Sequence, residues 1–230
     1  MFVIIKHADT YSSSPVSHCK IIDMTNEQIK ANLREAYNRQ AEARNQGGFD
    51  TWKFEERARF LSMLQQENKR TMLEIGAGHG RDSVFFQEQA FKVTAIDLSP
   101  AMIGLCRQKG ITALIMDMVD LGFTNETFDA AYALNTFLHL SKSEFPIAAK
   151  GVRRVLRPEG LFYLGLYGGY EFEGVWQDDS YDPKRFFSFH SDENLKNILA
   201  NSFEIVYFRS IRLGEDNITF QSVILRKQAS

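Results

Sequence analysis

Three closely spaced glycines mark the segment with the clearest chemistry, Leu73-Glu-Ile-Gly-Ala-Gly-His-Gly-Arg81. Glycine allows a sharp turn and lets a ligand approach the backbone where a Cβ atom would clash. Free amides at the start of a following helix favour an anionic group. Glu74 stands two residues before the first glycine, however, and its charge suits a cationic ligand better than a pyrophosphate. The segment therefore predicts a turn whose backbone contacts a ligand.

Further polar side chains stand where short apolar runs end. Asp97, Asp117 and Asn135 each follow such a run, and His139 comes four residues after Asn135. If the runs are parallel strands, these side chains gather at one edge of the sheet, where doubly wound folds bind ligands. Asp97 and Asp117 are also compatible with a helix start and a loop. His139 is compatible with a general base, a positioning group or a structural histidine.

A long segment from Tyr167 to His190 is rich in aromatic residues and is longer than a simple connection. It predicts a small pocket for an anionic or flat acceptor molecule, although a hydrophobic flap over the sheet edge is the other interpretation. The candidate acceptor-binding residues are Tyr167, Tyr170, Trp176, Arg185, Phe186 and His190.

Two helices are expected ahead of the glycine segment. Thr25-Asn-Glu-Gln28 fits a capping box, so a helix should run over 25–44. A second helix is expected over 51–66, with apolar residues at helical spacing. Its expected buried face consists of Phe54, Ala58, Leu61 and Leu64.

From residue 69 onward, short apolar runs alternate with helical segments. Strands are expected over 72–75, 91–96, 112–116, 128–134 and 160–167, and helices over 81–89, 99–109 and 141–156. The helix at 99 has Ser99 as N-cap and Pro100 at its first position, and the helix at 141 begins with a second capping box, Ser141 to Glu144. The end, 204–212 and 218–226, reads as an antiparallel hairpin. This alternation predicts an α/β fold with parallel βαβ units.

The glycine segment resembles motif I of the class I S-adenosylmethionine-dependent methyltransferases, an acid followed by three alternating glycines. The similarity continues in order along the chain, through Val93–Met102, Met116-Asp117-Met118, Phe128–Asn135 and Arg153–Phe162. The resemblance implies a Rossmann-like, doubly wound, mostly parallel seven-stranded sheet with a C-terminal antiparallel strand. His79 stands where relatives often have a smaller residue, and Glu159 replaces the first glycine of a usual Pro-Gly-Gly turn.

The resemblance also implies S-adenosyl-L-methionine as cofactor and S-adenosyl-L-homocysteine as product. By the same resemblance, Asp97 is expected to bind the ribose hydroxyls and Asp117 to contact the adenine amino group. Tyr37 resembles a tyrosine that closes over the cofactor, with core packing as the alternative. The implied cofactor-binding residues are Tyr37, Glu74, Gly76, Ala77, Gly78, Gly80, Asp97, Leu98, Met102, Asp117, Met118 and Asn135.

The expected organisation is an N-terminal arm, 1–23, followed by one methyltransferase domain, 24–230. Within the domain we expect N-terminal helices or a lid (24–68), a cofactor-binding core (69–167), a substrate-side insertion (168–190), and a last helix with the hairpin (191–230). The last sixty residues match the family only in layout.

The composition bears on partners and setting. The 230 residues carry 27 basic and 29 acidic side chains, a net charge of −2, so general nucleic-acid binding is disfavoured. Two cysteines and no cysteine cluster disfavour a zinc site, predict no metal and suit the cytoplasm. No apolar run is long enough to predict a membrane span.

Direct, in-line methyl transfer to a small-molecule acceptor by a monomer or homodimer is the favoured function. A methyltransferase for RNA or protein and a non-catalytic cofactor-binding module remain alternatives. A nicotinamide-dependent oxidoreductase is disfavoured because the third glycine comes one residue early for the dinucleotide pattern.

Overall fold

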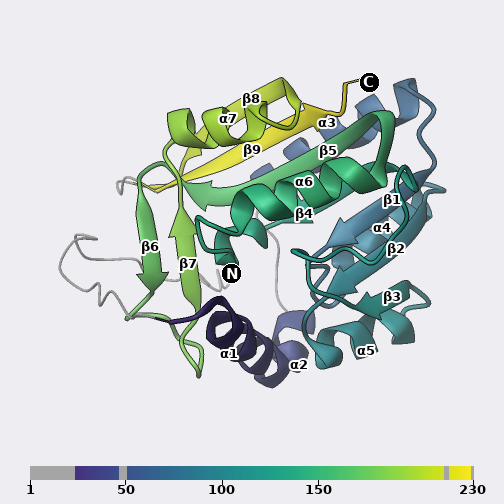
Figure 1. The fold of residues 1–230 in the computed structure, drawn as a ribbon. Helices are drawn as coiled ribbons and strands as arrows, with labels where there is room; N and C mark the ends of the chain where they lie inside the picture. Colours follow the sequence, from purple (N-terminus) through teal and green to yellow (C-terminus); the bar gives the residue numbers. More distant parts are fainter. Residues whose placement is uncertain (1–23, 47–50, 215–217, 229–230) are drawn as a thin grey trace, which may run out of the picture.

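A computed structural model describes residues 24–46, 51–214 and 218–228. A seven-stranded sheet with the order β3-β2-β1-β4-β5-β9-β8 forms the centre of the molecule (Figure 1). Its strands are β1 (Thr71–Ile75), β2 (Lys92–Asp97), β3 (Thr112–Ile115), β4 (Phe128–Leu134), β5 (Leu156–Gly168), β8 (Glu204–Arg212) and β9 (Thr219–Arg226). The expected N-terminal arm, 1–23, lies outside the described residues.

Parallel pairing joins β3, β2, β1, β4 and β5, whereas β9 pairs antiparallel with both β5 and β8. One strand of the seven therefore runs against the others. This arrangement confirms the predicted fold class. The strand order reverses between β1 and β4, and that switch point is where open α/β sheets bind ligands beyond the carboxyl ends of their strands.

Helices cover both faces of the sheet (Figure 1). On one face, α3 (Thr51–Gln66) and α4 (Arg81–Glu88) bury Phe60 and Phe86 against the stacked rings of Tyr132 and Tyr163. α5 (Pro100–Gln108) packs on β2 and β3. On the other face, α6 (Phe145–Val155) and α7 (Asp192–Ala200) contribute to the largest apolar cluster. Burial on both faces explains why the central strands read as continuous apolar runs.

The N-terminal helix begins as predicted and ends earlier. α1 (Asn26–Arg39) carries both hydrogen bonds of the capping box between Thr25 and Gln28. The expected helix over 25–44 is wrong at its end, because Gln40 leaves the helical conformation and a short helix, α2 (Ala41–Asn45), follows. The interruption separates two sets of contacts: Ala41 packs on α5, while Arg44 turns toward the ring of Tyr37.

The second capping box is only half formed. The side chain of Ser141 accepts a 3.3 Å hydrogen bond from the backbone amide of Glu144, but the expected helix start at Ser141 is wrong. A turn occupies 141–144, and α6 begins at Phe145. The carboxylate of Glu144 instead pairs with Lys30 of α1 at 2.7 Å, so the returning bond of a capping box is missing.

The face of α3 that packs on the sheet also differs from the expectation. Phe54 is 46% exposed and Ala58 is exposed, whereas Glu56 and Arg57 are buried with Phe60 and Leu64. The buried polar pair has partners: Arg57 meets Asp82 at 2.6 Å, and Glu56 accepts hydrogen bonds from β8 and β9 side chains. Periodicity based on apolar residues alone therefore placed Leu61 and Leu64 correctly and was wrong for Phe54 and Ala58.

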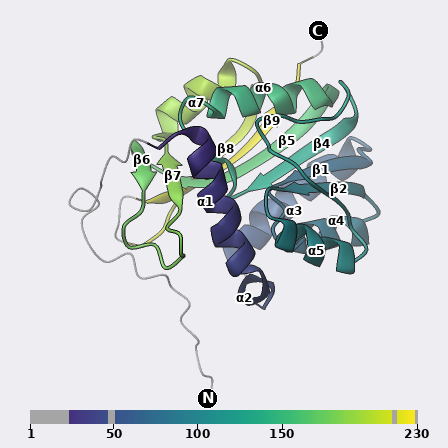
Figure 2. The same ribbon diagram turned by 60° about the horizontal axis from the view of Figure 1, so that its bottom comes forward.

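The segment between β5 and α7 forms a separate two-stranded antiparallel ribbon, β6 (Phe172–Val175) and β7 (Phe186–Phe189). Figure 2 shows α1 lying between this ribbon and α5. α1 contacts α5, and β7 contacts both β5 and the 3₁₀ turn η1 (Phe137–His139). The ribbon and the first two helices thus stand at the same end of the sheet.

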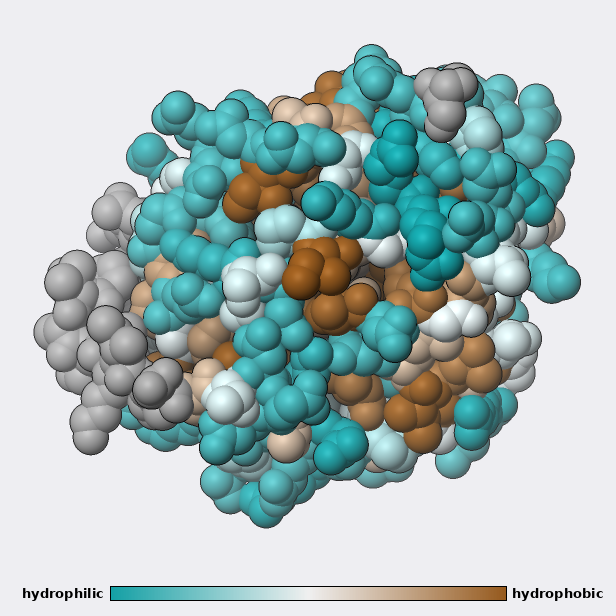
Figure 3. Space-filling model, in the orientation of Figure 1, coloured by the Kyte–Doolittle hydropathy of each residue, from teal (hydrophilic) through white to brown (hydrophobic). Residues whose placement is uncertain are grey.

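Apolar side chains reach the surface in small, separate groups among hydrophilic ones on the face shown in Figure 3. Leu114, Ile115 and Ile147 are large apolar side chains exposed within the described part of the chain. None of the described helices has the length and apolar character needed to cross a membrane.

Candidate functional site

A cavity of about 1120 Å³ lies at the carboxyl ends of β1, β2, β4 and β5. Its floor comes from the segments after these strands. α1 and α2 line another side, together with the segment that leads into β7. The cavity therefore occupies the topological switch point, which is the expected ligand site in this kind of sheet.

The glycine segment forms the part of the floor after β1. Gly76 and Gly78 have φ values of +67° and +55°, which favour glycine. A Cβ atom at Gly76 would overlap the side chain of Thr136, whereas a Cβ atom at Gly78 would meet nothing within 4 Å. Gly78 lines the cavity, so a ligand can lie directly against its backbone.

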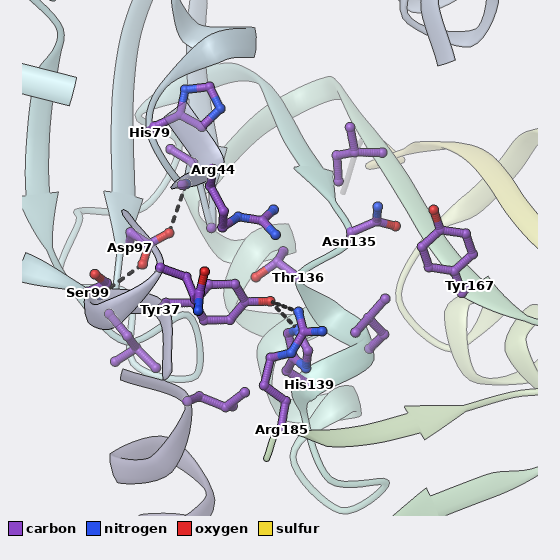
Figure 4. A pocket seen from close by; sticks show the side chains of 18 of the residues that line it. Tyr37, Arg44, His79, Asp97, Ser99, Asn135, Thr136, His139, Tyr167 and Arg185 are labelled. Carbon is purple, nitrogen blue, oxygen red and sulfur yellow. Dashed lines mark hydrogen bonds between the residues drawn. The ribbon is translucent and has the colours of Figure 1, made fainter. Parts of the chain in front are cut away.

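Asp97 lies at the end of β2 and holds two neighbouring segments. Its Oδ2 accepts a 2.9 Å hydrogen bond from the amide of Gly78, and its Oδ1 accepts a 2.8 Å bond from the amide of Ser99 (Figure 4). Burial raises the pKa of Asp97, although both amides act in the opposite direction. The carboxylate thus fixes the glycine turn and also faces the cavity.

Glu74 is buried in β1 below the glycine turn and accepts a short hydrogen bond from the hydroxyl of Ser83. Burial raises the pKa of Glu74 well above its ordinary value, and the nearby carboxylates of Asp82 and Asp97 add to the rise. Asp82 has its own cation in Arg57. A cationic ligand group beside Glu74 would favour the ionised carboxylate, which fits the positive charge predicted for the ligand.

Tyr37 of α1 reaches across the cavity to His139. The Tyr37 hydroxyl lies 2.6 Å from Nε2 of His139, while Nδ1 lies 2.7 Å from the carbonyl oxygen of Phe186 (Figure 4). A carbonyl oxygen only accepts, so Nδ1 carries the proton and Nε2 accepts from Tyr37. Burial, with Arg185 nearby, lowers the pKa of His139 to about 3. His139 is therefore a weak base, and the geometry favours its positioning role.

Two arginines surround the ring of Tyr37. Arg185 forms a two-pronged ion pair with Asp179, at 2.9 Å and 2.7 Å, and lies 3.5 Å above the ring centroid of Tyr181. Its Nη1 also donates a 3.3 Å hydrogen bond to the Tyr37 hydroxyl. The guanidinium of Arg44 lies 5.4 Å from the centroid of the Tyr37 ring and donates a 2.8 Å hydrogen bond to the Tyr181 hydroxyl.

Asn135 and Tyr167 form the part of the wall after β4 and β5. Asn135 has a φ of +54°, and its side-chain oxygen is buried without a protein partner. A buried, unpaired acceptor costs about 1–3 kcal/mol, so a ligand that donates a hydrogen bond there would relieve it. The hydroxyl of Tyr167 accepts a 3.1 Å hydrogen bond from Lys53 of α3.

The structure brings many of the predicted site residues to this cavity. They are Tyr37, Glu74, Gly76, Ala77, Gly78, Asp97, Leu98, Met118, Asn135, His139, Tyr167 and Arg185. His79, noted for its size, also lines the cavity. Its Nδ1 accepts from the Lys109 ammonium at 3.0 Å, and burial with that charge lowers its pKa to about 4.

Seven predicted site residues do not line the cavity. They are Gly80, Met102, Asp117, Tyr170, Trp176, Phe186 and His190.

Packing and pairing explain several of these positions. A Cβ atom at Gly80 would strike Ile111, and Met102 is fully buried beneath α2. Asp117 pairs with Lys30 of α1 at 2.8 Å, and His190 is buried against Phe145.

In the ribbon, Tyr170 and Trp176 pack on Phe189, while Phe186 contributes its carbonyl to His139. These three residues thus act on the cavity only through other groups.

Several cavity residues were missed from the sequence, among them Arg44, Thr136 and Tyr181. Arg44 follows Tyr37 by seven residues, the spacing of one helix face, so that signal was available. Thr136 and Tyr181 carry no comparable pattern. Among the described residues, no group of three His, Cys, Asp or Glu side chains is placed to hold a metal ion.

Comparison with known proteins agrees with this geometry. Residues 72–160 match a methyltransferase domain family. A Bacillus subtilis protein named as a methyltransferase, YqeM, is 29% identical over 120 residues, which are 49% of each chain. Glycine N-methyltransferase of Rattus norvegicus is 27% identical over 130 residues, 48% of this chain and 44% of the relative. The chain thus matches about half the length of these relatives.

Among solved structures, the Burkholderia thailandensis 1,6-didemethyltoxoflavin-N1-methyltransferase is similar over 94% of this chain and 95% of that one. The TM-score is 0.70 and the sequence identity 20%, so the likeness concerns the fold. That enzyme was crystallised with 1,6-didemethyltoxoflavin and S-adenosylhomocysteine bound. Residues 72–160 therefore match a methyltransferase domain, and the sheet order is that of the class I S-adenosylmethionine-dependent methyltransferase fold.

Proposed function

We propose that the chain binds S-adenosylmethionine and transfers its methyl group to a small-molecule acceptor. The observation that carries this proposal is that the glycine turn and the side chains of Tyr37, His139 and Arg185 line the same cavity. Pockets for small ligands commonly measure about 300–1,000 Å³. A cavity of about 1120 Å³ therefore has room for a cofactor together with a small second molecule.

The residues of the floor fit the cofactor. The carboxylate of Asp97 is placed to accept hydrogen bonds from ribose hydroxyls, and Glu74 and the unpaired oxygen of Asn135 suit the ammonium group. The open space beside Gly78 admits a ligand against the backbone. When bound, the cofactor supplies an electrophilic methyl group on a sulfonium.

The side chains over the cavity would orient the acceptor and exclude water. Tyr37 is held by His139 and Arg185, and the lining adds the rings of Tyr181 and Phe187. Holding two reactants in line supplies up to roughly 7–11 kcal/mol of barrier reduction. Such a site needs rigid walls more than it needs an acid–base pair, which agrees with the low basicity of His139.

A thermal-shift titration tests the cofactor. S-adenosylmethionine and S-adenosylhomocysteine at 100 times their dissociation constants should add roughly 2.7 kcal/mol of stability, while NAD should add none. For a chain of this size each kilocalorie raises the melting temperature by about 2–4 °C. Asp97→Ala should lose much of the shift. Stabilisation by NAD alone would contradict the proposal.

The acceptor class needs a second measurement. Product S-adenosylhomocysteine is measured with panels of small amines, phenols and carboxylates, and with RNA and peptides. Small-molecule turnover supports the proposal, whereas turnover of RNA with a steep decline in affinity at rising salt would replace it with a nucleic-acid substrate. Cofactor binding with no turnover of any panel member would favour a non-catalytic binding module.

A further inference from the structure

Arg44 is one of the cationic side chains in the cavity that the proposed cofactor leaves unexplained. Its guanidinium extends from α2 into the cavity, between the glycine turn and Asn135 (Figure 4). The Tyr181 hydroxyl and the Tyr37 ring hold it at 2.8 Å and 5.4 Å. Both neighbours are tyrosines, so they fix the guanidinium without supplying a carboxylate.

In the described part of the chain Arg44 forms no ion pair with a carboxylate, although its charge acts to lower the pKa of Asp97 across the cavity. Arg185, its neighbour, is paired with Asp179. The oxygens of Asp97 accept from two backbone amides, and Asp82 is paired with Arg57. A guanidinium fixed in a partly enclosed cavity attracts an anion more strongly than one in open water.

The acids of the cavity lie on one wall. The described acids of the lining, Glu74, Asp82 and Asp97, belong to β1, α4 and β2, where Arg81 of α4 also lines the cavity. The opposite wall, from α1, α2 and the segment before β7, contributes Arg34, Arg44 and Arg185 to the lining and no acid among the described residues. The cationic wall lies beside the aromatic rings of Tyr37, Tyr181 and Phe187, which suit a flat molecule.

His139, the histidine among the described residues of this wall, offers no free proton acceptor. Both ring nitrogens of His139 are used, one by the Phe186 carbonyl and one by the Tyr37 hydroxyl. A proton passed through Tyr37 would arrive at His139, whose pKa burial lowers to about 3. An acceptor that must lose a proton during the reaction would therefore find a weak base among the described residues.

We infer that the acceptor is a flat organic anion, bound by Arg44 and already deprotonated at the atom that is methylated. The inference rests on the proposed function and names its substrate class. The nucleophilic atom of the anion gives its electron pair to the methyl carbon, the carbon–sulfur bond breaks with its pair left on sulfur, and no proton moves. The sulfonium charge and the acceptor charge disappear together. Aromatic carboxylates and the conjugate bases of acidic heterocycles belong to this class.

Benzoate and benzamide are the probes for this inference, since they match in shape and differ in charge. Their affinities are measured by ligand-observed NMR on the full chain, saturated with either S-adenosylhomocysteine or sinefungin, whose amine adds a positive charge near the sulfonium position. We expect benzoate to bind at least about tenfold more tightly than benzamide, as for a charge-assisted hydrogen bond, and more tightly with sinefungin.

Arg44→Gln should remove the preference for benzoate while S-adenosylhomocysteine still binds. Arg39→Gln removes the same charge from α1 at a half-exposed residue that pairs with Glu35 and Asp182 and does not line the cavity, and should leave the preference intact. Equal binding of the two probes by the unmodified chain would overturn the inference, as would an undiminished preference in Arg44→Gln. A chain that fails to bind S-adenosylhomocysteine would instead defeat the proposed function, so the two failures are distinguishable.

Discussion

Gly78→Ala tests whether the cofactor lies against the backbone of Gly78, because the substitution should affect ligand binding more than folding. Gly78 has a φ of +55°, and a Cβ atom there meets no protein atom within 4 Å. The left-handed conformation costs alanine roughly 1–2 kcal/mol, and the less flexible unfolded chain returns about 0.4–1 kcal/mol. We expect a net loss of about 1 kcal/mol in the free energy of unfolding, or about 2–4 °C in melting temperature.

The larger effect of Gly78→Ala should fall on the cofactor. The new methyl group points into the cavity, where the backbone is otherwise open to a ligand. Overpacking of a fitted site costs about 1–3 kcal/mol, which weakens binding by roughly 5- to 150-fold. Isothermal titration of S-adenosylhomocysteine measures this change directly.

Gly110→Ala is the matched control. Gly110 has a φ of +76° and equally open space around its Cβ position, but it follows α5 and does not line the cavity. Both variants should lose similar stability, and only Gly78→Ala should lose affinity. Equal affinities in the two variants would refute the placement of the cofactor against Gly78. Gly76→Ala does not serve, because its Cβ atom overlaps Thr136 and would disturb the fold itself.

Three further changes test the surrounding structure. His139 is neutral in the fold, with a pKa lowered to about 3, so the unfolded chain gains a proton below pH 6.5. Between pH 6.5 and 5 this proton uptake lowers the free energy of unfolding by about 2 kcal/mol. His139→Gln should lose that much less stability on acidification, by urea unfolding at both pH values, and an unchanged pH dependence would contradict it. Arg57→Gln leaves Asp82 buried without its 2.6 Å partner and should cost about 3–5 kcal/mol, against under about 1 kcal/mol for the exposed Arg39→Gln; equal losses in urea unfolding would argue against a buried pair. Asn38→Ala removes the oxygen that accepts two hydrogen bonds from the start of α5 and should lower stability by about 1–2 kcal/mol; an unchanged midpoint would show that this link contributes nothing.

The succession of these strands and helices along the chain was predictable because local signals agreed with the fold. Ser99 caps α5 through a 3.1 Å hydrogen bond to the amide of Met102, and Gly110 ends the same helix with a positive φ, as the sequence indicates. Runs such as 130–134 contain no charged residue because helices cover both faces of the sheet. Glu159 adopts a φ of +61°, a conformation that favours glycine, which is the residue that the resemblance implies at this turn.

The buried stripe of α3 was less predictable, because polar residues bury well when partners arrive from distant segments. Glu56 is 1% exposed and meets Arg209 and Ser222, more than 150 residues further along the chain. Helical periodicity ranks residues by apolar character and ranks such a glutamate as exposed. Phe54 was misplaced for the same reason, since it is apolar and nevertheless lies on the surface.

In the site, too, the sequence predicts where a residue lies better than it predicts which group that residue binds. A short apolar run followed by an acid places Asp97 and Asp117 at the ends of neighbouring strands. Asp97 turns to the cavity because the amides of Gly78 and Ser99 fix both its oxygens there. Asp117 pairs with Lys30 of α1, some ninety residues earlier, and so holds that helix over the sheet. Strand periodicity determines where each acid stands, whereas the helix that packs above determines which acid remains available to a ligand.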